Sequence, residues 1–146
     1  MSLVKIRDGI TPDLRRKAKA MKNPNRALDA MGRAVISLGE RAFTDSVLRP
    51  TAWAPRKDDE PHPLLQKSTT LRKSLHHKKI QGKMVIIGSP TKYAAIHQLG
   101  GKTGRRGATK IPARPYLPFL NGKLTDRGDV AVARALRAAI KADLGA

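Results

Sequence analysis

Residues 26–48 carry the feature that most constrains the fold of this chain, a helical repeat of apolar side chains. The residues that recur at spacings of three and four are Leu28, Met31, Val35, Leu38 and Ala42. Such a spacing places them on one face of an α-helix. A helix of this length spans roughly 35 Å, the width of a small domain. We therefore expect residues 26–48 to form the main core helix, ended by Pro50.

Further helices are predicted on both sides of this segment. Residues 12–22 predict a short basic helix, because Thr11 is a good capping residue and Pro12 fits the first helical position. A short helix is expected around Leu71. A last helix is expected to begin at Thr125 or Asp126 and to end near residue 144.

The segment over residues 90–99 predicts one more helix, with clear signals at both ends. Ser89 is a good N-cap and Pro90 fits the first position of the helix. Gly100 fits the position just past the last turn. We therefore expect a short helix that leads directly into the glycine-rich segment after it.

Strands are predicted in three places. Residues 75–80 and 83–88 predict a hairpin that turns at Gln81-Gly82, because the second segment is apolar and β-branched. Residues 3–7 are consistent with a first strand. Residues 111–120 contain prolines at positions 112, 115 and 118, which cannot donate to a ladder. This segment therefore predicts an edge strand or a polyproline-like arm.

Together these elements predict an α+β fold in a single domain over residues 1–146. We expect a small antiparallel sheet to pack against the helix over residues 26–48 and against the C-terminal helix. Its strands would be residues 3–7, 75–80, 83–88 and 114–119.

Two long loops, at about residues 50–63 and 100–111, are expected to be flexible. The first is rich in proline and charge, and the second is basic and glycine-rich with almost no apolar side chain. The lone tryptophan, Trp53, lies in the first loop. It is expected either to fill the edge of the core or to anchor a partner.

The charge of the chain points to a polyanionic partner. Thirty Lys and Arg face 11 Asp and Glu, for a net charge of +19. This fits contact with nucleic acid, an anionic membrane surface or an acidic protein. The chain contains no cysteine, which excludes disulfides and thiolate chemistry, and no apolar run of about 20 residues, so we expect no membrane span.

No catalytic constellation is visible in the sequence. Gly101-Lys102-Thr103 has the end of a phosphate-binding loop, but Ile96 occupies the position of the glycine that such a loop needs. His97 has no Ser-His-Asp or metal-ligand spacing around it. We therefore predict no catalytic, cofactor-binding or metal-binding residues and no enzyme activity.

Two motifs give the chain its specific resemblance. They are YAAIHQLGG at residues 93–101 and IPARPYL at residues 111–117, preceded by a Leu-x-x-Ser element at residues 71–74 and a VIIGS strand end at residues 85–89. With the order of the predicted elements, they resemble the phage virion morphogenesis family, the Mu-type tail completion and head–tail joining proteins of long-tailed phages.

The resemblance implies a non-enzymatic structural protein of the virion, without cofactors. It would act at the head–tail junction, completing the tail or joining it to the head as part of a ring, most simply a hexamer. Its partners would be copies of itself, neighbouring neck, connector, tail-tube or terminator proteins, and passing genomic DNA, bound non-specifically. It would occupy the host cytoplasm during assembly. The alternative is a basic, non-specific nucleic-acid-binding protein.

Two sets of residues follow from this hypothesis. The expected contacts to a neighbouring subunit or ring are Trp53, Tyr93, His97, Gln98, Arg105, Arg106, Arg114, Tyr116 and Phe119. The expected contacts to DNA in a channel or to an acidic partner are Lys102, Arg105, Arg106 and Lys110.

Overall fold

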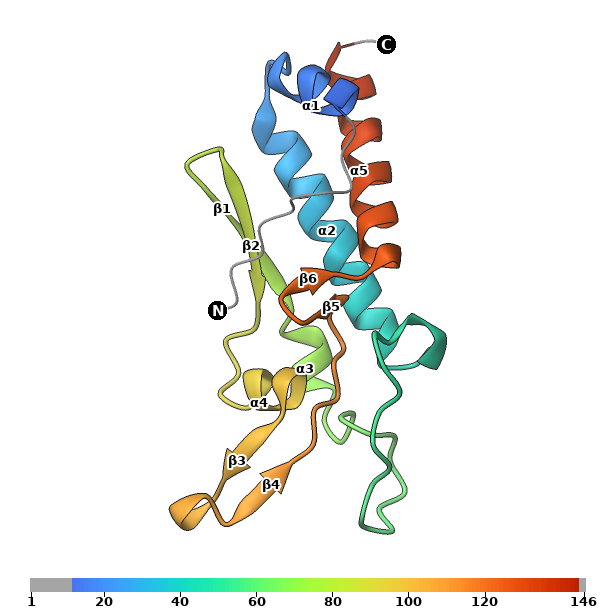
Figure 1. The fold of residues 1–146 in the computed structure, drawn as a ribbon, viewed down its shortest axis with the longest axis vertical. Helices are drawn as coiled ribbons and strands as arrows, with labels where there is room; N and C mark the ends of the chain where they lie inside the picture. Colours follow the sequence, from blue (N-terminus) through green and yellow to red (C-terminus); the bar gives the residue numbers. More distant parts are fainter. Residues whose placement is uncertain (1–11, 145–146) are drawn as a thin grey trace.

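A computed structural model describes residues 12–144 as an elongated α+β fold (Figure 1). The helices are α1 (Pro12–Lys19), α2 (Pro24–Ala42), α3 (Thr70–Lys73), α4 (Ala94–Leu99) and α5 (Asp126–Leu144), with two 3-10 turns, η1 (Ser46–Leu48) and η2 (Arg105–Gly107). The strands are β1 (His76–Ile80), β2 (Met84–Gly88), β3 (Gly101–Thr103), β4 (Thr109–Ile111), β5 (Phe119–Leu120) and β6 (Lys123–Leu124). The predicted fold class is confirmed.

Two long helices, α2 and α5, lie side by side and form one end of the molecule (Figure 1). The predicted apolar stripe of α2 is buried apart from Met31, which is half-buried, and the face of α5 that carries Val132, Leu136 and Ile140 is buried as well. Thr125 caps the start of α5 from the position before it, since its Oγ1 accepts a hydrogen bond of 3.2 Å from the amide of Gly128. This confirms Thr125 as the capping residue.

The core helix is shorter than predicted, because α2 ends at Ala42 rather than near residue 48. Arg49 folds back, and its Nε donates to the carbonyl of Ala42 at 2.8 Å. Asp45 accepts from the amide of Val47 at 3.0 Å and starts the separate turn η1. These side chains satisfy backbone groups that would otherwise be bonded by a continuing helix.

The predicted hairpin is confirmed, but the single sheet is wrong. β1 and β2 pair from His76 opposite Gly88 to Ile80 opposite Met84 and pack on α2. Within residues 12–144 the strands form separate two-stranded hairpins, β1–β2, β3–β4 and β5–β6. The expected strand at residues 114–119 is not formed, since prolines remove donors there and only β5 pairs at its end. The expected strand at residues 3–7 lies outside the described residues.

The fourth helix begins later than predicted, at Ala94 instead of Pro90. Ser89 does not cap it. The Ser89 hydroxyl instead accepts from the amide of Thr91 at 3.1 Å and lies 2.6 Å from the hydroxyl of Ser74. Gly100 does stand just past the last turn, with φ of 71°. The signal at the end of this helix was therefore more informative than the signal at its start.

The two expected loops differ in structure. Residues 50–63 contain no helix or strand. Residues 100–111, in contrast, form the β3–β4 hairpin around η2, and this hairpin extends from the end of the molecule opposite α1 (Figure 1). The expected flexibility of both segments stays a prediction.

The core has two parts. The larger part joins α2, α5 and the β1–β2 hairpin to the segment around Tyr116, and includes Val35, Phe43 and Trp53. The smaller part lies between α1, α2 and α5, and is built from Leu14, Met21, Ala27, Leu136, Ala139 and Ile140. Met31 of α2 packs against both parts.

Candidate interaction site: the proline arm and the basic hairpin

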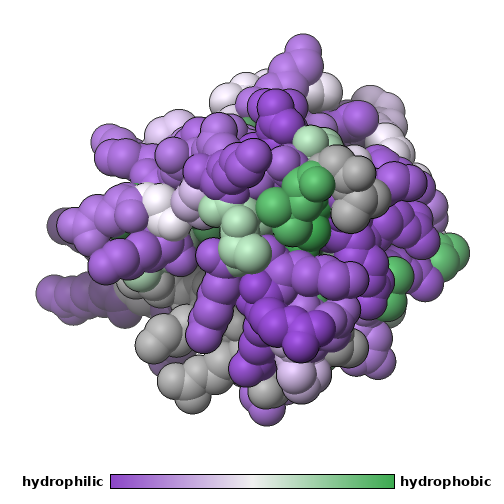
Figure 2. Space-filling view, turned by 90° about the horizontal axis from the view of Figure 1, so that it is seen from above, coloured by the Kyte–Doolittle hydropathy of each residue, from purple (hydrophilic) through white to green (hydrophobic). Residues whose placement is uncertain are grey.

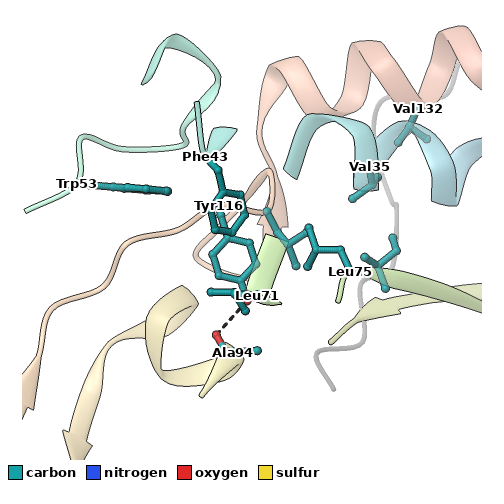
Figure 3. Close-up of a cluster of buried hydrophobic side chains, with 10 residues drawn as sticks. Val35, Phe43, Trp53, Leu71, Leu75, Ala94, Tyr116 and Val132 are labelled. Carbon is teal, nitrogen blue, oxygen red and sulfur yellow. Dashed lines mark hydrogen bonds between the residues drawn. The ribbon is translucent and has the colours of Figure 1, made fainter. Parts of the chain in front are cut away.

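Residues 112–118, here called the proline arm, are held by a cluster of aromatic side chains. Tyr116 and Phe43 are buried, with ring centroids 5.2 Å apart, and Trp53 packs edge-on against Phe43 at 5.9 Å. The Tyr116 hydroxyl donates to the carbonyl of Ala94 at 3.0 Å (Figure 3). Burial raises the pKa of Tyr116 to about 12, so the hydroxyl keeps its proton and remains a donor.

Trp53 fills the core of its own protomer. Its indole Nε1 donates to the carbonyl of Pro115 at 2.8 Å, and the residue as a whole is 8% exposed. The guanidinium of Arg49 lies 3.7 Å above the centre of the indole ring. Of the two roles open to Trp53, the structure therefore supports the first, a plug that binds the loop at residues 50–63 to the proline arm.

Gln98 connects α4 to the arm through the backbone. Its Oε1 accepts from the amides of both Tyr116 and Leu117, each at 3.0 Å. The amide of Arg114 donates to the carbonyl of His97 at 2.7 Å. Because the prolines of the arm have no amide hydrogen, these remaining amides supply the main-chain hydrogen bonds that the arm donates to the body.

Arg114 links the other side of the arm to the loop at residues 50–63. Its Nε donates to the carbonyl of Ala54 at 2.9 Å and its Nη2 to the carbonyl of Pro55 at 3.1 Å. The side chain is half-buried. Its hydrogen bonds within the protomer make Arg114 a fastening for the arm.

The β3–β4 hairpin is a separate, strongly basic surface. Lys102, Arg105, Arg106 and Lys110 are all exposed, and residues 100–111 contain no Asp or Glu. In the register of the hairpin Lys102 stands directly opposite Lys110. Within residues 12–144, no salt bridge reaches any of these four side chains. Like charges opposite one another destabilise a strand pair, so this arrangement favours an external anion.

Gly100 joins the arm to the hairpin in a way that only glycine allows. Its φ of 71° lies in the left-handed region. A Cβ built there would lie 2.8 Å from the amide nitrogen of Ala113. The start of the hairpin and the start of the proline arm are therefore packed backbone to backbone.

A hollow of about 270 Å³ lies beside α4 and is lined by Tyr93, His97, His62, Lys67, Ser68, Leu65 and Leu71. Tyr93 is 42% exposed and packs edge-on against His97 at 5.9 Å. The Nδ1 atom of His97 is buried without a hydrogen-bond partner in the structure. Burial, and then the nearby charge of Arg114, hold the pKa of His97 below its ordinary value.

The geometry around His97 gives no sign of catalysis. Within the described part of the chain, no group of three or more His, Cys, Asp or Glu residues is arranged to hold a metal ion. The hydroxyl groups near His97 belong to Tyr93 and Ser68, and no carboxylate lines the hollow. His97 lines this hollow, where its ring packs against Tyr93.

Eight of the nine predicted interface residues fall into three groups, and the ninth, His97, lines the hollow beside α4. Trp53, Tyr116 and the partly buried Phe119 belong to the protomer core, while Gln98 and Arg114 fasten the arm. Tyr93 and the basic side chains of the hairpin are exposed. The structure brings the first two groups together around the arm and places the hairpin apart from them (Figure 1).

Sequence reasoning missed two contributions to this framework. One is Arg49, whose position just after a helix end was the available signal. The other is Asp29, which binds His77 at 3.0 Å and Lys79 at 2.9 Å and so holds β1 against α2. These two contacts lower the pKa of Asp29, with Lys79 as the larger cause. No local pattern predicts this contact between distant segments.

Comparison with known proteins identifies the family. Over 32 residues the chain is 59% identical to the Mu-like prophage FluMu G protein 2 of Haemophilus influenzae, and this segment covers 22% of the chain and 23% of that relative. No solved structure matches significantly. Within residues 12–144, every helix is too short or too polar to cross a membrane. The sequence profile of the phage virion morphogenesis family matches residues 6–141, so the chain belongs to that family.

Proposed function

We propose that the protein acts at the head–tail junction of a tailed phage, where it completes the tail or joins it to the head as one subunit of a ring. By resemblance to the family the ring would be a hexamer, and like any closed ring of identical subunits it would repeat one heterologous interface. The neighbouring components would be neck, connector, tail-tube or terminator proteins. Membership of the family supports a structural role in virion assembly rather than catalysis.

The observation that carries the proposal is the exposed basic hairpin. All of its charged side chains lie outside the contacts that hold the protomer together. Its backbone is nevertheless anchored, because Gly100 packs against Ala113 at the base. A surface whose backbone is fixed, and whose side chains make no contacts that stabilise the protomer, is suited to binding a neighbour.

The positive charge of the hairpin suggests the kind of partner that it binds. Four cations without a nearby carboxylate favour an acidic surface on an adjoining ring or the phosphates of DNA passing through the channel. The opposite end of the molecule, seen from the side of α1, is also covered mostly by hydrophilic side chains (Figure 2). In this proposal Tyr93, His97, Arg105 and Arg106 contact the neighbour, and the buried members of the predicted set hold the arm in position for them.

The experiment is complementation of a phage that lacks the gene. Replacing residues 102–110 with Gly-Gly keeps a short connection between Gly101 and Ile111, which are already paired. We expect the variant to fold, as judged by circular dichroism and thermal unfolding, and to leave separate heads and tails in electron micrographs. Full recovery of infectious particles would contradict the proposal.

A charge-matched control separates the hairpin from charge in general. One variant changes Lys102, Arg105, Arg106 and Lys110 to Ser. The control changes four exposed arginines of the helices to Ser: Arg33, Arg41, Arg134 and Arg137. Only the hairpin variant is expected to lower the phage titre. Equal loss in both would mean that total charge matters rather than the hairpin.

Direct DNA binding is the second candidate function, and the same basic hairpin favours it. That function predicts tight binding of free duplex by the isolated protein, with a salt slope that falls by about 0.9 for each phosphate contact removed. The structural role predicts weak or absent binding outside the assembled ring. Titrating labelled duplex at several salt concentrations, with the wild type and the four-serine hairpin variant, distinguishes them.

A further inference from the structure

The end of the molecule that carries α1 is a second basic surface, opposite the β3–β4 hairpin (Figure 1). Residues 12–26, which comprise α1 and the turn into α2, contain six Lys and Arg against one Asp. All six of these basic side chains are exposed. Such a concentration of positive charge on one short segment is the electrostatic pattern of a surface that binds a polyanion.

The first helix is anchored to the body, so these cations have defined positions. Leu14 and Met21 are buried in the smaller part of the core, together with Leu136 and Ile140 of α5. The amide of Lys22 donates to Oδ2 of Asp143 at 2.6 Å and so holds the turn after α1 against the end of α5. A basic segment that is already ordered loses less conformational freedom on binding than a free one would.

The turn of the β1–β2 hairpin adds a cation from a distant part of the chain. A Cβ built on Gly82 would lie 3.8 Å from Oδ1 of Asn25, so this turn approaches the start of α2. The next residue, Lys83, is exposed and lines the same groove as Lys19 of α1. The name α1 surface is used here for six exposed side chains: Arg16, Lys17, Lys19, Lys22, Arg26 and Lys83.

Carboxylates of the protomer neutralise only part of the α1 surface. Asp13 pairs with Arg16 at 2.7 Å and with Lys17 at 3.1 Å. Both pairs are exposed to solvent, where ion pairs are weak and are readily exchanged for another anion. The other four side chains of the surface take part in no salt bridge within residues 12–144: Lys19, Lys22, Arg26 and Lys83.

The composition of this end favours the phosphates of duplex DNA over an acidic protein. Its segments, residues 12–31, 76–88 and 132–144, contain no Phe, Tyr or Trp. Protein interfaces are enriched in aromatic side chains and depleted of Lys, and single strands are bound by stacking on aromatic rings. The phosphates of a duplex require only cations. Beside the basic hairpin, in contrast, Tyr93 is 42% and Leu99 is 71% exposed.

We propose that the α1 surface binds the phosphate backbone of duplex DNA without sequence preference, at a site separate from the basic hairpin. This binding goes beyond the proposed place in the virion, since it belongs to the single protomer as well as to any assembly. A protomer that contacts only about four phosphates binds weakly at physiological salt, with a Kd on the order of 10⁻⁴ to 10⁻⁶ M. Several copies on one duplex would bind far more tightly.

Titration of a labelled duplex with the full chain, from about 50 mM salt upward, tests the proposal. The variant changes four side chains to Gln, which keeps a good helix former in the helices: Lys19, Lys22, Arg26 and Lys83. We expect its affinity at about 50 mM salt to fall at least tenfold. The salt slope should become shallower by about 3, because each lost phosphate contact removes about 0.9.

A matched control removes the same charge from other helical positions. It changes four exposed arginines to Gln: Arg33, Arg41, Arg134 and Arg137. The control should bind the duplex within about threefold of wild type, because these side chains lie outside the α1 surface. Equal losses in variant and control would overturn the proposal, as would a wild type that does not bind at about 50 mM salt. A loss that occurs only when the four hairpin cations are replaced would assign the DNA to the hairpin instead.

NMR locates the site without any substitution. Adding duplex to isotope-labelled protein should shift the amide signals of residues 16–26 and 82–84 and leave those of residues 101–111 unchanged. Polyglutamate stands for an acidic protein partner. Its charges are spaced by about 3.5 Å when extended, against about 1.7 Å along a duplex, so it should need at least about tenfold more charge for the same shifts. Equal potency of the two polymers, or shifts confined to the hairpin, would contradict the proposal.

Discussion

Single side chains around the proline arm form hydrogen bonds that replace those its prolines cannot donate. The prolines at positions 112, 115 and 118 have no amide hydrogen, so the arm depends on a few remaining donors. The Oε1 atom of Gln98 accepts from two of these amides. Tyr116 donates to the carbonyl of Ala94, and Trp53 donates to the carbonyl of Pro115. The arm is thus stabilised by side-chain hydrogen bonds where a strand would use a ladder.

Replacing Gln98 with Ala should destabilise the protein markedly. It leaves the amides of Tyr116 and Leu117 without their acceptor, at a cost of about 1–3 kcal/mol for each buried donor. Gln98→Glu is the matched control, since it keeps an acceptor oxygen at the same position. Urea unfolding followed by circular dichroism measures both. A loss below about 0.5 kcal/mol for Gln98→Ala would show that the arm is held by packing alone.

His97 should make stability depend on pH. Burial lowers its pKa in the folded state below the ordinary value of 6.5, so the unfolded chain binds a proton more readily. Above pH 6.5 His97 is neutral in both states and costs no free energy of unfolding. Below that pH the unfolded chain takes up the proton first, so the free energy of unfolding falls as the pH drops toward the pKa of the folded state. Urea unfolding midpoints between pH 5 and 8 should therefore fall on the acidic side, and His97→Gln should flatten the curve in this window. An unchanged slope in the variant would rule His97 out as the cause.

At the scale of elements, the base of the basic hairpin depends on the close approach at Gly100. Gly100→Ala adds a Cβ 2.8 Å from the amide nitrogen of Ala113 at a φ of 71°. Gly122→Ala is the control, because its φ of 74° is similar but nothing lies within 4 Å of the new atom. The control should cost about 1 kcal/mol and Gly100→Ala clearly more. Thermal unfolding compares them, and equal losses would mean that backbone strain alone matters at Gly100.

Elements with a strong local signal could be predicted from the sequence. The apolar repeat of α2, the β-branched run of β2 and the turn at Gln81-Gly82 each depend on neighbours in the chain. The end of α2 was missed because Arg49 reaches back to carbonyls that periodicity does not describe. The separation of the strands into three hairpins was missed because pairing partners are set by tertiary contacts.

The candidate site was also predictable only in part, because its motifs are local but the partners of their side chains are set by tertiary contacts. The motifs at residues 93–101 and 111–117 do meet in space, through Gln98 and the amide of Arg114. The sequence could not show that Trp53 and Tyr116 would be buried within the protomer, since their partners Phe43 and Ala94 lie 10 and 22 positions away in the chain. The basic hairpin was found as a charge pattern, and only its regular pairing came from the structure.

In the whole molecule, the helical body and the basic hairpin lie at opposite ends. Two long helices and the β1–β2 hairpin build the body, and the proline arm connects it to a basic hairpin at the opposite end (Figure 1). Its net charge of +19 exceeds what solubility requires of a domain this small. This excess of positive charge is the reason why we propose an acidic protein surface or DNA as the neighbour of the basic hairpin.

Locating the protein in purified virions tests the central claim most directly. A tag on the C-terminus, labelled with gold and viewed by electron microscopy, should mark particles at the junction of head and tail. Tails purified without heads, or heads without tails, would show which partner recruits it. Label confined to the head–tail junction is the predicted result. Virions that lack the protein, or that carry it only elsewhere, would contradict the account.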